Sequence, residues 1–155
     1  MLKRLVRTLC AVLCAAMSLG AVSAWAVTSD ALDLASLNGK VVYVDFWASW
    51  CVPCRDSFPW MNELQHEFGK QGLVIVAVNL DHERSDAEEF LRRLSPDFGI
   101  SYDPQGLLAE QFHVKGMPTS VLIDRNGNVV TQHTGFRLAD RGALRDQVRA
   151  LLVTH

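Results

Sequence analysis

Residues 45–54 read DFWASWCVPC and place two cysteines, Cys51 and Cys54, where an apolar stretch ends. The stretch Val41–Trp47 is continuous, β-branched and aromatic, which is typical of a strand buried on both faces. After Cys51, apolar side chains recur at helical spacing and predict a helix over residues 52–68. The cysteine pair therefore lies where a buried strand passes into a helix, and this junction decides the fold.

The rest of the chain adds strands and helices around this junction. A second apolar run, residues 73–80, follows the helix, and this order predicts a parallel βαβ unit with a right-handed crossover. Further along, the sequence predicts helices over 86–94 and 107–112, strands over 119–124 and 128–134, and a final helix capped by Asp140 and ending at Leu152. The expected fold is α/β: a mixed central sheet flanked by helices, with a helical insertion between its βαβ and ββα halves.

The N-terminal segment differs in kind from the rest. Three basic residues precede an uncharged apolar run over residues 9–19, and small residues follow up to Ala26. This pattern predicts a secretory signal peptide over residues 1–26 and a mature domain over residues 27–155. The alternative is an uncleaved membrane anchor, for which the apolar run is short. Since the segment holds three of the 15 basic residues and none of the 17 acidic ones, the mature chain carries a formal charge of −5, 12 basic against 17 acidic.

Charge and cysteine usage narrow the function. A mildly acidic domain offers no basic patch for nucleic acid or for anionic lipid. Cys10 and Cys14 leave with the signal peptide, so Cys51 and Cys54 are the cysteines of a domain in an oxidising compartment. A zinc site would need two further ligands, and the histidines stand singly, so no metal is expected. A static disulfide between residues three apart would constrain little of the unfolded chain.

Redox chemistry fits the position of the pair. At the start of a helix, free N–H groups and the helix dipole favour an anion. Such a site can lower the pKa of a thiol from about 8.5 into a range of about 3.5 to 7.5. Cys51 would then be a thiolate near neutral pH, and Cys54, one turn further along, would lie near enough to attack a mixed disulfide.

These residues also carry a family resemblance. DFWASWCVPC resembles a thioredoxin active site, and the stretches VVYVDFWASWCVPC, FPWMNEL, LVIVAVNLD, DPQGLLAEQFHVKGMPTSVLIDRNG and TGFR resemble the TlpA/ResA-like family of exported thiol–disulfide oxidoreductases. The resemblance covers about residues 34–152 and implies a thioredoxin-like fold. By this resemblance, Cys51 is the exposed nucleophile, Cys54 is the buried resolving thiol, and Val52 and Pro53 tune the redox potential.

The resemblance also implies where a substrate binds. Pro118 matches the cis-proline that faces the active site in this family, and a cis X–Pro bond persists only where the fold requires it. The backbone of Met117 would then pair with an extended substrate segment, as in strand addition. Trp50, just before the nucleophile, is expected to form an aromatic rim for docking partners. Thr119 stands where cytochrome c maturation specialists usually carry an acidic residue.

Asp45 is the unusual residue of the predicted strand. A buried carboxylate is costly unless it is paired or protonated, and burial raises its pKa. In thioredoxins, an aspartate at the matching position lies beneath the resolving cysteine and relays its proton. The TlpA-like branch usually has a glutamate three residues after the second cysteine, where this chain has Ser57. We expect Asp45 to exchange a proton with Cys54, with a purely structural, hydrogen-bonded aspartate as the alternative.

The sequence thus predicts a periplasmic protein thiol–disulfide oxidoreductase that needs no cofactor. The family favours a reductase of disulfides in exported or membrane-bound proteins, as in cytochrome or copper-site maturation. A membrane electron donor would regenerate it, and a monomer is expected. A thiol oxidase or disulfide isomerase of the same fold is the nearest alternative, because the redox direction cannot be read from Val52 and Pro53. A copper(I) carrier and a structural interaction domain are the further alternatives.

Overall fold

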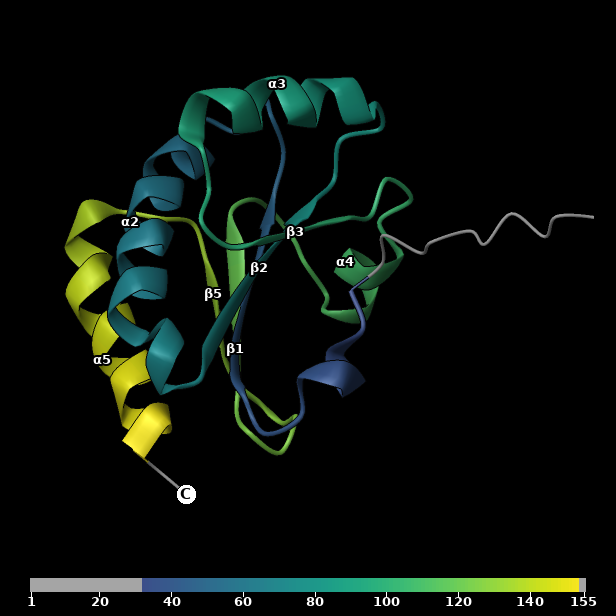
Figure 1. Cartoon of the computed structure of the whole chain (residues 1–155). Coiled ribbons are helices and arrows are strands. Elements are labelled where there is room, and N and C mark those ends of the chain that lie inside the picture. Colours follow the sequence, from purple (N-terminus) through teal and green to yellow (C-terminus); the bar gives the residue numbers. More distant parts are fainter. Residues whose placement is uncertain (1–31, 154–155) are drawn as a thin grey trace, which may run out of the picture.

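A five-stranded mixed sheet forms the centre of the protein (Figure 1). The computed structural model describes residues 32–153, so the predicted signal peptide lies outside the described residues. The strand order is β3-β2-β1-β4-β5, where β1 and β2, and β2 and β3, pair in parallel, and β4 pairs antiparallel with both β1 and β5. The strands are β1 (Val41–Trp47), β2 (Leu73–Asn79), β3 (Gly99–Tyr102), β4 (Thr119–Ile123) and β5 (Val129–Thr134).

Helices cover both faces of the sheet. The helices are α2 (Val52–Phe68), α3 (Arg84–Leu94), α4 (Leu107–Gln111) and α5 (Arg141–Val153), with 3-10 turns η1 (Leu34–Leu37), η2 (Gly69–Gln71) and η3 (Leu138–Asp140). In Figure 1, α2 and α5 run side by side along one face, α3 crosses the end at which α2 begins, and α4 and η1 lie on the opposite face. The predicted α/β architecture, with α3 and α4 as the helical insertion, is confirmed. No helix among residues 32–153 has the length and apolar character needed to cross a membrane.

The central strand β1 explains why the two faces are both covered. All seven of its residues are buried. Its alternate side chains Tyr43 and Trp47 join the core cluster beneath α2, α3 and α5, whereas Val44 and Phe46 join the cluster on the α4 side. A strand whose successive side chains enter different cores is expected to be apolar, and Val41–Trp47 follows this pattern except at the buried Asp45.

Two local features differ from the sequence prediction. Strand β3 was not predicted, because it has four residues at a sheet edge and only Ser101 among them is buried. Asp140 was predicted to cap the last helix, but it ends the turn η3, and its carboxylate accepts hydrogen bonds from the guanidinium of Arg137 at 2.9 and 3.1 Å. The charged neighbour provides a stronger partner than the backbone N–H groups of a helix start.

One arginine joins three segments at the end of the sheet where β1 starts. The Arg125 guanidinium donates to the backbone carbonyl oxygens of Gly39 at 2.8 Å, Leu152 at 3.3 Å and Gln71 at 3.4 Å. Gly72 is close by with φ of 105°, and a Cβ there would lie 3.0 Å from Nη1 of Arg125. Glycine is therefore required at residue 72 both for its left-handed backbone and for the space that the arginine takes.

We expect Arg125→Ala to lower the free energy of unfolding by about 1 to 2 kcal/mol, because three carbonyl groups lose a charged donor at a partly exposed site. Urea denaturation followed by circular dichroism measures this change. Arg92→Ala, on the exposed face of α3, is the matched control and should stay within about 0.5 kcal/mol of the parent. Equal stability of the Arg125 and Arg92 variants would contradict the assignment.

Candidate active site

The two cysteines lie at the start of α2, where the predicted strand-to-helix junction places them. Cys51 is the N-cap residue of α2, with φ of −78° and ψ of 108°, and its N–H donates to the carbonyl of Ala48 at 3.1 Å. Pro53 occupies the first turn, where a missing N–H costs nothing because those groups have no intrahelical partner. The free N–H groups of this turn and the helix dipole would favour a negative charge on Cys51 when the thiol is reduced.

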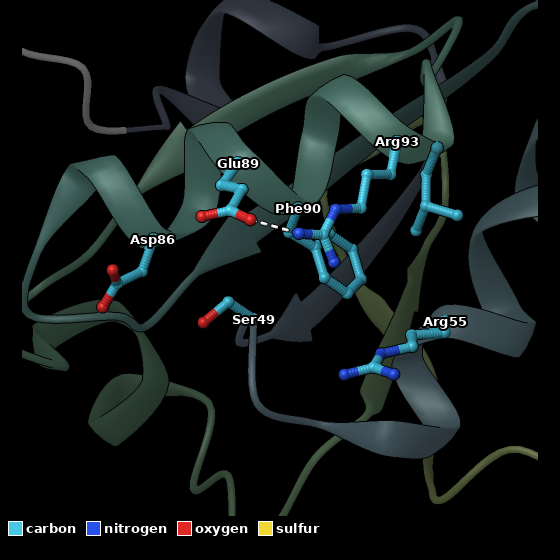
Figure 2. A pocket seen from close by; sticks show the side chains of 7 residues that line it. Ser49, Arg55, Asp86, Glu89, Phe90 and Arg93 are labelled. Carbon is cyan, nitrogen blue, oxygen red and sulfur yellow. Dashed lines mark hydrogen bonds and ion pairs between the residues drawn. The ribbon is translucent and has the colours of Figure 1, made fainter.

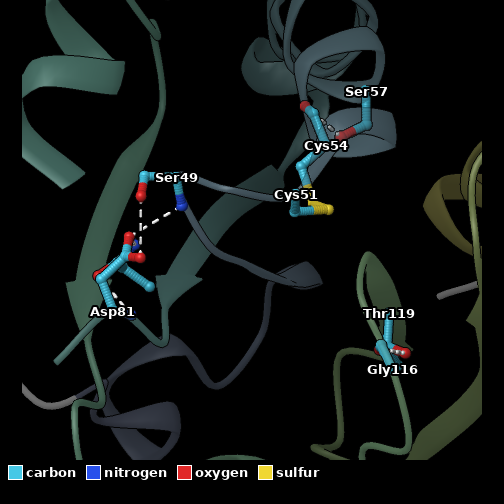
Figure 3. Close-up of a disulfide and its surroundings, with 8 residues drawn as sticks. Ser49, Cys51, Cys54, Ser57, Asp81, Gly116 and Thr119 are labelled. Carbon is cyan, nitrogen blue, oxygen red and sulfur yellow. Dashed lines mark hydrogen bonds between the residues drawn. A yellow bond between two sulfur atoms is a disulfide. The ribbon is translucent and has the colours of Figure 1, made fainter. Parts of the chain in front are cut away.

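Cys51 and Cys54 form a disulfide with a Cα–Cα distance of 5.3 Å (Figure 3). Cys54 is fully buried, as expected, whereas Cys51 is only 4% exposed, so the expectation of an exposed nucleophile does not hold for the disulfide form. Both residues belong to the core cluster beneath α2. The residues that reach solvent are the neighbours of Cys51: the side chains of Trp50 and Val52 are 68% and 66% exposed.

A loop with a cis-proline lies beside the junction. The Met117–Pro118 peptide bond is cis, and β4 begins at Thr119, directly opposite Phe46 near the end of β1. The hydroxyl of Thr119, which is fully buried, donates to the carbonyl of Gly116 at 2.6 Å. The N–H of Gly135 donates to the carbonyl of Pro118 at 2.7 Å. Thr119 thus holds the loop from inside, a task that an acidic residue could not perform at a buried position without a large desolvation cost.

Asp45 is buried in the middle of β1, with 2% of its surface exposed. Because side chains alternate along a strand, it shares the α2 side of the sheet with Tyr43 and Trp47, the side on which Cys54 is buried. Its Oδ2 atom has no hydrogen-bond partner in the described part of the chain. Burial raises the pKa of this carboxyl well above its usual value. Burial thus favours the protonated form of this carboxyl, and a buried acid on this side of the sheet is suited to exchange a proton with a nearby thiol.

Ser57 does not substitute for the glutamate of the family. Its hydroxyl is buried and donates to the carbonyl of Cys54 at 3.0 Å, one turn back in α2. A serine hydroxyl does not ionise near neutral pH, and this one is committed to the helix backbone. Asp45 is thus a buried acid on the side of the sheet that carries the disulfide.

A polar network that was not predicted from the sequence holds the loop before Cys51. The Asp81 carboxylate accepts from the backbone N–H of Ser49 at 2.9 Å and from its hydroxyl at 3.0 Å (Figure 3). The side-chain amide of Asn79 donates to the same carboxylate at 2.7 Å. The signal was present in the sequence, because Asn79 ends β2 and Asp81 follows it as Ser49 follows β1, and parallel neighbours end at the same sheet edge.

A groove of about 290 Å³ opens between this loop and α3. Figure 2 shows Arg55 and Asp86 on opposite sides of Ser49, with Phe90 and the Glu89–Arg93 ion pair above it. Neither cysteine lines the groove. It is a mixed-charge surface next to the disulfide and not the reacting centre itself.

Comparisons with known proteins agree with this geometry. The Redoxin family profile matches residues 19–147. The thiol-disulfide oxidoreductase ResA of Geobacillus kaustophilus is 39% identical over 102 residues, which are 66% of this chain and 59% of ResA. The chain therefore spans less than two thirds of the length of the ResA proteins that it matches.

Solved structures show the same likeness. A Chlorobium tepidum protein assigned as thiol:disulfide interchange protein DsbE is 52% identical, with a TM-score of 0.77 over 78% of this chain and 86% of that chain. A second thiol:disulfide interchange protein from this organism, of the thioredoxin family, is 26% identical, with a TM-score of 0.67 over 78% and 86% of the two chains. The predicted thioredoxin-like fold and the resemblance to the TlpA/ResA-like proteins are confirmed.

The raised pKa of Asp45 predicts how stability changes with pH. The folded-state pKa lies above the usual value of 3.8, so the contribution of Asp45 to stability is fully present at pH below the unfolded-state pKa. It is lost as the pH rises through the folded-state pKa. We expect Asp45→Asn, which carries no titrating proton, to gain stability relative to the parent as the pH is raised from about 4 to 8.

Denaturant unfolding at a series of pH values measures this gap, and Asp124→Asn is a control of opposite sign. Hydrogen bonds from Asn128 and Asn126 lower the pKa of Asp124. Its contribution is therefore present at neutral pH and is lost as the pH falls. A difference between the Asp45 variant and the parent that stays constant with pH would show that Asp45 is not a buried acid with a raised pKa.

Proposed function

Because this chain belongs to the Redoxin family, we propose that its Cys51–Cys54 pair carries out thiol–disulfide exchange with other proteins. The observation that carries the proposal is a disulfide at the N-cap of a helix, next to a cis-proline loop. A redox pair at this position combines a stabilised thiolate with a resolving thiol in the same helical turn. The relatives named above as thiol-disulfide oxidoreductase and thiol:disulfide interchange protein support the same chemistry.

The reaction proceeds in two displacement steps. The Cys51 thiolate attacks a disulfide of the partner, one partner sulfur leaves as a thiolate, and a mixed disulfide forms. The Cys54 thiol then gives its proton to the Asp45 carboxylate and attacks Cys51, which releases the second partner sulfur. The partner is reduced by two electrons, and the Cys51–Cys54 disulfide remains.

The surface around Cys51 suggests how a partner binds. Trp50 and Val52 are exposed large apolar side chains on either side of a nearly buried cysteine. A partner segment that packs on them can extend to the loop at Pro118 and pair with the backbone of Met117. Val52 and Pro53 would set the redox potential through their effect on the first turn of α2.

The proposed setting is the periplasm, with the signal peptide over residues 1–26 cleaved or retained as an anchor. The partners are exported or membrane-bound proteins with cysteines, of the kind matured in cytochrome or copper-site assembly. A membrane electron donor keeps the pair reduced, since the compartment itself is oxidising. The protein acts as a monomer without a cofactor.

Trapping of mixed disulfides tests the exchange itself. In Cys54→Ala the resolving thiol is absent, so Cys51 should remain joined to its partners in complexes that dithiothreitol releases. Cys51→Ala keeps the other thiol and should give none, because Cys54 is fully buried. Non-reducing electrophoresis of periplasmic extracts, followed by mass spectrometry, identifies the partners. Equal trapping by the two variants would contradict the assignment of Cys51 as the nucleophile.

The reduction potential of the pair tests the direction. We expect a value near that of thioredoxin, about −270 mV, as a reductase requires. Equilibration with defined glutathione mixtures and alkylation of free thiols measure it. A value near about −120 mV would instead support a thiol oxidase. One tightly held copper ion per reduced chain, with no reduction of insulin disulfides, would support the copper(I) carrier.

A further inference from the structure

Strand register places four side chains in one row across the sheet. Asp45 on β1 is paired with Ala77 on β2 and with Ser120 on β4, and Ser120 is paired with His133 on β5. Laterally paired residues point to the same face of a sheet, so the row lies on the α2 side together with Cys54. Polar groups therefore continue from the buried Asp45 toward the β5 edge and not toward β2, where Ala77 offers none.

The two ends of this row differ in their access to solvent. Asp45 is 2% exposed and Ser120 is 7% exposed, while the His133 side chain is 32% exposed. Yet Nε2 of His133 is itself buried, and it has no hydrogen-bond partner among the described residues, as is also true of Oδ2 of Asp45. Two buried polar atoms that lack a hydrogen bond to any described residue thus lie on either side of the Ser120 hydroxyl group.

We propose that His133 is the outer end of a proton path that leads from Asp45 across Ser120 to the surface. The proposal rests on the function proposed above, and it assigns His133 and Ser120 as positioning and proton-carrying groups that do not touch the substrate. Neighbouring strands lie about 4.8 Å apart, a gap that a hydroxyl group or one bridging water spans. Histidine is the side chain suited to exchange a proton with solvent near neutral pH.

The path has a definite chemical task. When Cys54 attacks the mixed disulfide, the Cys51–Cys54 bond forms, the bond from Cys51 to the partner breaks, and the electron pair leaves on the partner thiolate. The proton of Cys54 goes to Asp45 and then through the Ser120 hydroxyl to Nε2 of His133, and from the His133 ring to solvent. Reduction of the disulfide by a donor moves the proton in the opposite direction, to the departing Cys54 thiolate.

Burial is the reason for such a path. The buried Asp45 carboxyl has a raised pKa and must release its proton before it can accept the proton of Cys54. The groups facing it are Tyr43 on its own strand, Ser120 on β4 and Cys54 on α2. The Tyr43 hydroxyl is hydrogen-bonded to the Ser120 side chain, and burial, followed by the charge of Asp45, raises the pKa of Tyr43, so that it remains neutral. Tyr43 can hold the Ser120 hydroxyl in place but provides no exit to solvent.

The charges around His133 fit the outer end of a path. Asp140 lies with Oδ2 at 3.6 Å from Nε2 of His133, and Arg137 also donates to Asp140. At the start of α5, Arg141 is paired with Glu63 of α2. The His133 ring thus lies beside the Arg137–Asp140 ion pair at the edge of the sheet, where a proton can pass between the ring and solvent.

Two-phase reaction with 5,5′-dithiobis(2-nitrobenzoate) tests the proposal in the full chain. Attack by Cys51 releases one thionitrobenzoate at a rate that depends on reagent concentration, and resolution by Cys54 releases the second at a concentration-independent rate. We expect His133→Gln to slow the second phase about tenfold near neutral pH and to leave the first unchanged. Ser120→Ala should act in the same way, and the double variant should be no slower than either single variant.

Controls separate proton transfer from a structural effect. His66 is the matched control, because it also pairs with an aspartate, with its Nε2 at 2.9 Å from Oδ2 of Asp97, but lies on the exposed surface of α2. His66→Gln should therefore leave both phases unchanged. Added imidazole should restore the second phase of His133→Ala in proportion to its concentration. An unchanged second phase and pH profile in His133→Gln, or no response to imidazole in His133→Ala, would overturn the path. Absence of both phases in the parent protein would instead overturn the proposed exchange function.

Discussion

The packing of α2 across the buried face of β1 is the contact on which the rest of the structure depends. The rings of Trp47 and Phe58 meet at 5.0 Å and those of Tyr43 and Trp60 at 5.9 Å, so two aromatic pairs fix the helix to the strand at two levels. Because these contacts fix the position of α2 on the sheet, the helix must begin at the end of β1. Cys51 then becomes an N-cap residue, and the electrostatic setting of the disulfide follows from core packing.

The interior of the protein also contains the buried carboxyl groups of Asp45 and Asp81. The central strand carries a carboxyl group at Asp45 whose Oδ2 has no hydrogen-bond partner within residues 32–153, and an apolar side chain there would give a more stable fold. Asp81, also buried, has its carboxylate well paired with Ser49 and Asn79. The paired Asp81 holds a loop, whereas the proposed proton exchange with Cys54 would explain why Asp45 is kept at a position where it costs stability.

Much of this arrangement could be predicted from the sequence. Val41–Trp47 and residues 52–68 were found with their observed bounds, because the strand is β-branched and aromatic apart from Asp45 and the helix has a clear period. Strand β3 escaped prediction since four residues at an edge show no pattern. The Ser49–Asp81 contact and the row from Asp45 to His133 depend on which residues face one another across strands. Register is set by tertiary packing, so these contacts cannot be read from any one segment.

The three carbonyl groups bound by Arg125 also determine how the two ends of the domain are arranged. Arg125 holds Gly39 and Leu152 at the end of the sheet where β1 starts. Gly39 is close to the first described residues, and Leu152 is near the end of α5. Cys51 follows the opposite end of β1. A seven-residue strand separates these poles by about 20 Å. A dye, a biotin group or a surface linker attached beyond α5 therefore stands away from the disulfide. The protein can be immobilised with its sulfur chemistry facing outward.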